Sequence, residues 1–208
     1  LGFMGTLIAL ERAQALRHPL SYAAPILLGV GGLVAIAGVA PRVGLLLLFD
    51  GALAFVFVLA ALYRRAPLPL VAAQIVGVLL AAAGAGLLVV RDVSTVVPLL
   101  SGFIVVTIAA ERAELAQLTM GRRAVPTLVA VTTWLAATSV TTLLWPAAVR
   151  LFGVGVLVVA LWLLRDDVGR RLIKTDGLRR FNAAALLAGN IWLVVAGVTW
   201  LIVGQPTT

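Results

Sequence analysis

The chain has 208 residues, of which 62% are hydrophobic and only 12% are charged, and its formal net charge is +8. Soluble domains are about half apolar and about one quarter charged, and the mean hydropathy of +1.15 lies far above that norm. The composition therefore excludes a soluble protein. Because there is no cysteine, it also excludes disulfides, thiolate metal sites and a cysteine nucleophile.

Apolar runs interrupted by arginine, proline and glycine predict eight membrane-spanning helices, since about 20 helical residues cross the hydrocarbon core of a bilayer. In chain order these spans cover residues 1–17, 20–40, 43–63, 68–90, 95–118, 124–144, 147–164 and 181–203. Their connections are short, apart from the polar linker 165–180. Consecutive helices are therefore expected to be antiparallel neighbours.

Cations lie mainly at or after the ends of the odd-numbered spans. Thirteen are found there, namely Arg12, Arg17, Arg64, Arg65, Arg112, Arg122, Arg123, Arg165, Arg170, Arg171, Lys174, Arg179 and Arg180. The other side holds three, Arg42, Arg91 and Arg150. The positive-inside rule predicts a multi-pass protein of the cell membrane in which the loops after odd-numbered helices are cytoplasmic. Topology and anionic lipid account for the charge, so we expect no nucleic-acid partner.

The tripeptide Glu11-Arg12-Ala13 recurs one hundred residues later as Glu111-Arg112-Ala113, and seven of the thirteen positions 1–13 are identical to 101–113. This echo predicts two four-helix transmembrane repeats, residues 1–92 and 93–208. Because each has an even number of spans, both enter the membrane in the same sense, as in parallel-repeat transporters. The predicted fold class is an all-α, polytopic transmembrane helix bundle of about eight spans, built as two parallel four-helix repeats.

The same alignment indicates that residues preceding Leu1 are missing from the sequence. The alternative interpretation of the repeat is that duplication merely records how the bundle grew.

Charges inside apolar spans are costly and mark candidate sites. Adjacent residues on a helix point about 100° apart, so the glutamate and arginine of one pair satisfy each other poorly. We expect Glu11 to pair with Arg112 and Arg12 with Glu111 at the repeat interface. Both pairs also lie near the inner boundary of the membrane. The alternative is therefore that the arginines reach lipid headgroups while the glutamates cap the rim of the bundle.

Asp50, Gln74 and Asn190 are the other candidates for a substrate or ion site. Asp50 is a carboxylate inside a span without a neighbouring cation in sequence, and its alternative role is an ion pair with Arg91 or Arg150. Gln74 and Asn190 are expected close to mid-membrane at equivalent places of the fourth and eighth spans. An interhelical hydrogen bond is the alternative to ligand contact for both amides.

The sequence predicts no catalytic residue, metal ligand or cofactor. The single histidine, His18, cannot provide two axial haem ligands, and the single lysine, Lys174, lies in the polar linker where it cannot hold a buried retinal. No catalytic triad, phosphate-binding loop or glycine fingerprint is visible, and an enzyme is not expected.

Two functions remain. The first is a small-solute or ion transporter with a site at the repeat interface, which predicts a hydrated cavity reaching mid-membrane. The second is a non-catalytic subunit or scaffold of a larger membrane complex, which packs against partner helices, lipid or quinone. That function predicts a dry bundle with a lateral face covered by other protein subunits. Membrane lipid is an expected partner in both.

Overall fold

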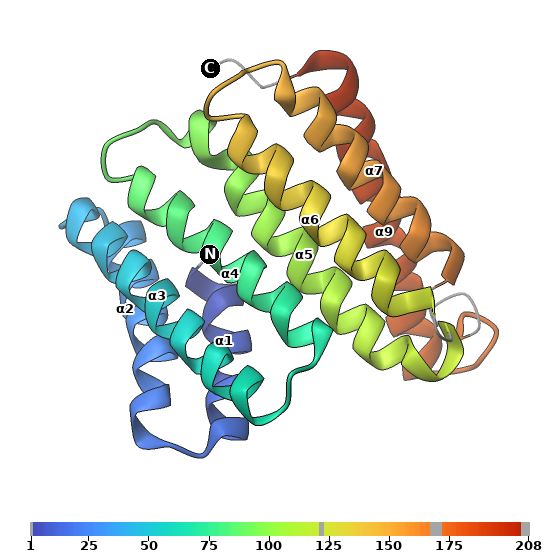
Figure 1. The fold of residues 1–208 in the computed structure, drawn as a ribbon, viewed down its shortest axis with the longest axis horizontal. Helices are drawn as coiled ribbons and strands as arrows, with labels where there is room; N and C mark the ends of the chain where they lie inside the picture. Colours follow the sequence, from blue (N-terminus) through green and yellow to red (C-terminus); the bar gives the residue numbers. More distant parts are fainter. Residues whose placement is uncertain (1, 121–122, 167–171, 205–208) are drawn as a thin grey trace. The chain divides into compact units, whose positions relative to one another are not determined.

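The computed structural model describes residues 2–120, 123–166 and 172–204, which form helices joined by short connections, with no strand among them (Figure 1). In chain order the helices are α1 (Gly2–Leu16), the 3-10 helix η1 (Pro19–Tyr22), α2 (Ala23–Ala37), α3 (Pro41–Arg65), α4 (Pro69–Leu87), α5 (Val93–Met120), α6 (Ala124–Thr141), α7 (Ala148–Asp166) and α9 (Leu178–Val203). Arg122, Arg170 and Arg171, three of the cations used to predict the topology, lie outside the described residues.

Among the described residues, seven helical segments are long and apolar enough to cross a membrane. They are Pro19–Ala37, Pro41–Arg65, Pro69–Leu87, Val93–Ala113, Ala124–Thr141, Ala148–Arg165 and Leu178–Val203. Helix α1 is not among these segments, because its described part has only 15 residues. The chain is therefore an all-α, multi-pass membrane protein, and the helix boundaries predicted from hydropathy agree with the structure to within a few residues.

Helix ends are set by the residues that punctuate the apolar runs. Pro41 and Pro69 stand in the first turns of α3 and α4, where the missing backbone N–H would have no partner in the helix. Gly38 ends α2 in the left-handed conformation at φ 70°, which glycine adopts without steric cost. Arg17 adopts the same region at φ 55° directly after α1, although it carries a side chain.

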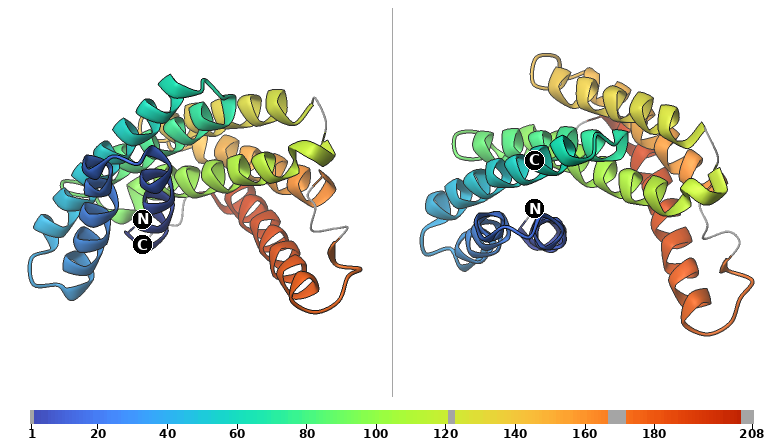
Figure 2. Two further views of the ribbon diagram at one scale, coloured as in Figure 1. Left: turned by 90° about the horizontal axis from the view of Figure 1, so that it is seen from below. Right: turned by 60° about the horizontal axis from the view of Figure 1, so that its bottom comes forward.

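The helices form two compact units, Leu1–Ile104 and Val105–Thr208. The boundary falls inside α5 rather than in the loop before it. The first unit contains α1 to α4 and the start of α5, and the second contains the rest of α5 with α6, α7 and α9. Within each unit, successive helices run in opposite directions (Figure 1, Figure 2). Whether the two halves are repeats related by a twofold axis remains a prediction.

Close backbone approach between α2 and α3 holds the first unit together. A Cβ added to Gly44 would lie 2.5 Å from the backbone nitrogen of Ala35, and one added to Gly51 would lie 2.8 Å from that of Leu28. Only glycine permits this approach, and the packing of α2 against α3 follows from it.

In the second unit the same kind of contact joins α7 to α9. A Cβ on Gly153 would lie 2.8 Å from the nitrogen of Leu201, and one on Gly197 would lie 2.9 Å from that of Leu157. Phe152 and Trp200 pack beside these glycines in a tilted arrangement, with ring centroids 4.7 Å apart and an angle of 58° between the ring planes.

Candidate functional site

Gln74 is the most deeply buried of the predicted site residues, with 2% of its surface exposed. It lies in α4 five residues after Pro69. Neither Nε2 nor Oε1 has a hydrogen-bond partner among the residues that the structure describes, although both atoms are buried. The interhelical hydrogen bond that was one predicted role of Gln74 is therefore not found among the described residues.

Packing explains how Gln74 comes to be buried. Ala73, Gly77, Ala81 and Ala85 recur at four-residue spacing along α4, and all four are buried. Small residues at this spacing allow a neighbouring helix to approach closely. Because Gln74 directly follows Ala73, its side chain stands at the edge of this buried stripe and enters the protein interior.

Asn190 is also buried, with 8% of its surface exposed. It lies in α9 twelve residues after Leu178. The position along the helix thus differs from that of Gln74, which is much closer to the start of α4. The two amides belong to different compact units, and whether they contribute to one site remains a prediction.

Asp50 lies inside α3, nine residues after Pro41, as the sequence predicts for a carboxylate within a span. Its side chain is exposed on the surface of the helix. Val43, Leu46 and Phe57, at helical spacing from it, are exposed too. No ion pair between Asp50 and Arg91 is found among the described residues, and a pair with Arg150, which belongs to the second unit, remains a prediction.

The two Glu-Arg pairs lie in different units, Glu11 and Arg12 in α1 and Glu111 and Arg112 in α5. Glu11 is exposed, and the other three side chains are half-buried. Glu111 lies eighteen residues after Val93, the first residue of α5, and its depth at the inner boundary of the membrane remains a prediction. The reciprocal ion pairs remain a prediction.

The alanines around the two pairs share one property. Ala9 and Ala13 in α1, and Ala109 and Ala113 in α5, are each 0% exposed. Each copy of the motif therefore buries the face that carries its alanines, spaced four residues apart.

Two threonines, Thr107 and Thr132, are further candidates for the site. Several described threonine hydroxyls in these spans donate to the carbonyl four residues earlier, as Thr133 does to Val129 and Thr199 to Val195, both at 2.8 Å. By contrast, the hydroxyls of Thr107 and Thr132 are buried without a hydrogen-bond partner in the described structure. Both belong to the second unit.

No group of three or more histidine, aspartate or glutamate side chains that could hold a metal ion occurs among the described side chains, which are those of residues 2–113, 123–165 and 172–204. What the described residues offer instead are neutral polar groups buried within each unit, the amide of Gln74 in the first and the hydroxyls of Thr107 and Thr132 in the second. Each of these groups can bind water, a small polar solute or a weakly coordinated cation through its oxygen atom.

Residues 1–208 match the protein family described as a domain of unknown function, DUF8744, and the chain belongs to this family. No curated protein and no solved structure matches the chain.

Proposed function

We propose that this protein moves a small polar solute or an ion across the membrane, and that Gln74 is part of the path. The observation that carries the proposal is the burial of both polar atoms of Gln74 without a described hydrogen-bond partner. A small polar occupant inside the bundle would satisfy them. The protein's multi-pass helical architecture is compatible with this role.

Energetics favours an occupant over an empty site. An amide carries two donor hydrogens and an acceptor oxygen, and leaving such a buried group unsatisfied costs about 1–3 kcal/mol. Most buried polar side-chain atoms of folded proteins have a partner, which is either protein or ordered water. An amide that is 2% exposed and has no described protein partner is thus a reasonable contact for water or a permeating solute.

Thr107 and Thr132 support the same function. A threonine in a transmembrane helix normally satisfies its hydroxyl on its own backbone, as Thr138 does by donating to Trp134 at 2.8 Å. Hydroxyls that are buried and do not bond in this way remain available to a ligand. We propose that the polar path also includes Asn190. Its end at the repeat interface would be formed by the predicted ion pairs of Glu11 with Arg112 and of Arg12 with Glu111.

We further propose that the protein lies in the cell membrane with the ends of α1, α3, α5 and α7 in the cytoplasm. The predicted excess of arginine at these ends is the support for this orientation.

Flux through reconstituted vesicles tests the proposal. Purified protein in liposomes is assayed with protons, Na⁺, K⁺, glycerol and urea as probes, and the wild type is compared with Gln74→Met and Thr133→Val. The Met side chain has a similar size but no hydrogen-bonding amide. The hydroxyl of Thr133 is already bonded to its own helix, which makes Thr133→Val the matched control.

We expect the wild type to pass at least one probe faster than protein-free vesicles do. Gln74→Met should lower this flux at least tenfold, and Thr133→Val should leave it within twofold. Equal flux through wild type and Gln74→Met would contradict a role of Gln74 in the path.

A specific observation also favours the second function, a non-catalytic subunit or scaffold of a membrane assembly. Asp50 is exposed on the surface of α3 within its span. A charged residue near the bilayer centre costs about 2.5–3.5 kcal/mol on insertion scales. A partner helix, from another protein or from a second copy of this chain, would remove Asp50 from lipid.

The two functions differ in what accompanies the protein in mild detergent. A stoichiometric partner that is lost in Asp50→Leu but retained in Leu46→Ala, a change on the same exposed face, would support the subunit function. A wild-type chain that purifies alone and passes a probe would support transport.

A further inference from the structure

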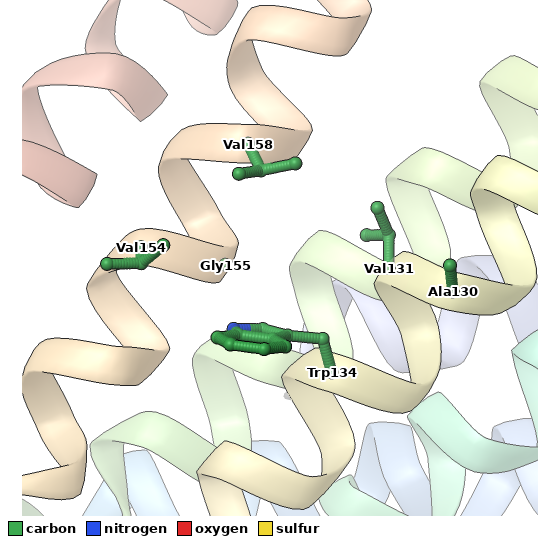
Figure 3. A pocket seen from close by; sticks show the side chains of 6 residues that line it. All are labelled: Ala130, Val131, Trp134, Val154, Gly155 and Val158. Carbon is green, nitrogen blue, oxygen red and sulfur yellow. The ribbon is translucent and has the colours of Figure 1, made fainter.

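The second unit carries a pocket of about 240 Å³ between α6 and α7 (Figure 3). Its lining consists of Ala130, Val131, Trp134, Val154, Gly155 and Val158. Val131 and Gly155 are buried, whereas Trp134 and Val158 are 46% and 48% exposed. The pocket therefore has a buried floor and opens on the lateral surface of the helix pair.

Trp134 and Gly155 build this pocket together. The indole Nε1 of Trp134 donates a hydrogen bond to the carbonyl oxygen of Leu151 at 3.0 Å, which fixes the ring against α7. A Cβ on Gly155 would lie 2.5 Å from Cδ1 of the same ring. The glycine thus makes room for the indole, and the indole forms one wall of the pocket (Figure 3).

The chemistry of the wall selects an apolar occupant. All six lining side chains are apolar except for the Nε1 atom of Trp134, and that atom already donates to Leu151. A headgroup, a hydroxyl or a quinone ring would find no free side-chain donor or acceptor there. The volume of about 240 Å³ is also below the range of about 300–1,000 Å³ that is typical of sites for drug-sized molecules.

The position of the pocket indicates where such an occupant comes from. Trp134 lies seven residues before the end of α6 at Thr141, and Gly155 lies seven residues after the start of α7 at Ala148. At about 1.5 Å per residue, both are about 10 Å from the helix ends that face the connection 142–147. Because both helices are long and apolar enough to span a membrane, the pocket opens into the hydrocarbon core, where acyl chains are the abundant apolar molecules.

We propose that the pocket between α6 and α7 is a binding site for one acyl chain of a phospholipid, held against the face of Trp134. The bound chain fills the gap between Val131 and Val158 and contacts the indole, whose N–H is engaged by the protein. This site lies in the second unit, and the proposal does not depend on Gln74, which belongs to the first.

Quenching of tryptophan fluorescence by brominated phospholipid tests the proposal in the intact protein. The chain has five tryptophans, so the contribution of Trp134 is taken as the difference between wild type and Trp134→Phe. Proteoliposomes are prepared with phospholipid brominated at carbons 6 and 7 or at carbons 11 and 12. Ala130→Phe fills the pocket, and Val129→Phe, at an exposed neighbour that does not line it, is the matched control.

We expect the lipid brominated at carbons 11 and 12 to quench more than half of the Trp134 emission. Ala130→Phe should reduce this quenching at least twofold, and Val129→Phe should leave it unchanged. Native mass spectrometry of the detergent-solubilised protein should show one retained phospholipid that is lost in Ala130→Phe. If that variant does not fold, Ala130→Leu provides the same comparison with a smaller side chain.

Three results would overturn the proposal. Quenching in Ala130→Phe equal to that in Val129→Phe would show that no chain enters the pocket. An unquenched Trp134 in the wild type would show that protein covers this face. Saturable quenching by a short-tailed quinone at low mole fraction, abolished in Ala130→Phe, would reassign the pocket to a quinone.

Discussion

Arg65, the last residue of α3, donates a hydrogen bond from Nη1 to the carbonyl oxygen of Leu16, the last residue of α1, at 3.1 Å. The carbonyl groups at the end of a helix have no partner within it and carry the negative end of the helix dipole. An arginine from a neighbouring helix satisfies both needs. This contact joins two helices that are distant in sequence at the end of the bundle that the positive-inside rule assigns to the cytoplasm.

Replacing Arg65 should therefore weaken the first unit more than replacing its neighbour Arg64. We expect Arg65→Met to lower the unfolding free energy by about 0.5–1 kcal/mol, since the arginine is exposed and solvent screens the interaction. Arg64→Met should change it by less than half as much. Thermal unfolding in detergent measures both, and equal effects would show that only the loss of charge matters.

The glycines between α2 and α3 give a second prediction. Gly44→Ala places a Cβ 2.5 Å from the backbone nitrogen of Ala35, so the helices must separate. The expected loss is about 3 kcal/mol. Gly189→Ala in α9 is the control, because a Cβ there meets nothing within 4 Å.

Gly189→Ala should raise the unfolding free energy by up to about 1 kcal/mol, since alanine favours the helix over glycine. Unfolding curves in a denaturing detergent compare the two variants. A Gly44→Ala protein as stable as Gly189→Ala would contradict the close packing of α2 and α3.

Orientation gives a third prediction, which the absence of native cysteine makes easy to test. Ala66→Cys, between α3 and α4, should be cytoplasmic, and Asp92→Cys, between α4 and α5, should face outward. In intact cells a membrane-impermeant maleimide should label the second variant and spare the first until the cells are lysed. The reverse pattern would invert the proposed topology.

Hydropathy was enough to predict the class of fold and the limits of the helices, because the length and continuity of apolar runs are local properties. The direction in which each side chain points is not local. Asp50 illustrates the difference, since its exposure follows from the rotation of α3 that places Gly44 and Gly51 against α2. A signal was present, because Gly44, Leu48, Gly51 and Phe55 recur at helical spacing on the buried side of α3, and Asp50 lies off that stripe.

Among the polar groups of the candidate site, some properties could be predicted from local sequence and others depend on tertiary packing. Burial of Gln74 could be expected from the small residues that accompany it along α4. The sequence could not predict that the hydroxyls of Thr107 and Thr132 do not bond to their own helices, because this depends on the rotamer that tertiary packing selects. The reciprocal Glu-Arg pairs remain a prediction, as do the two repeats that they would join.

Stability of a Gln74 variant distinguishes a solute contact from a structural hydrogen bond. If the amide has no protein partner, Gln74→Met loses no intramolecular hydrogen bond, and the unfolding free energy should stay equal or rise. A fall of more than about 1 kcal/mol, the range expected for an interhelical hydrogen bond, would indicate a protein partner. Thermal unfolding in the same detergent, with Thr133→Val as reference, provides the measurement.

If a polar occupant reaches Gln74 inside the bundle, a single cysteine placed at this position should be accessible from water. In the cysteine-free chain, Gln74→Cys is treated with a small, water-soluble methanethiosulfonate in proteoliposomes. The control is Leu80→Cys, at a residue of α4 that is 4% exposed and has no polar group. We predict that Cys at position 74 reacts at least ten times faster than Cys at position 80, because the thiolate forms only where water enters. Equally slow reaction at both positions in folded protein would contradict a polar occupant at Gln74.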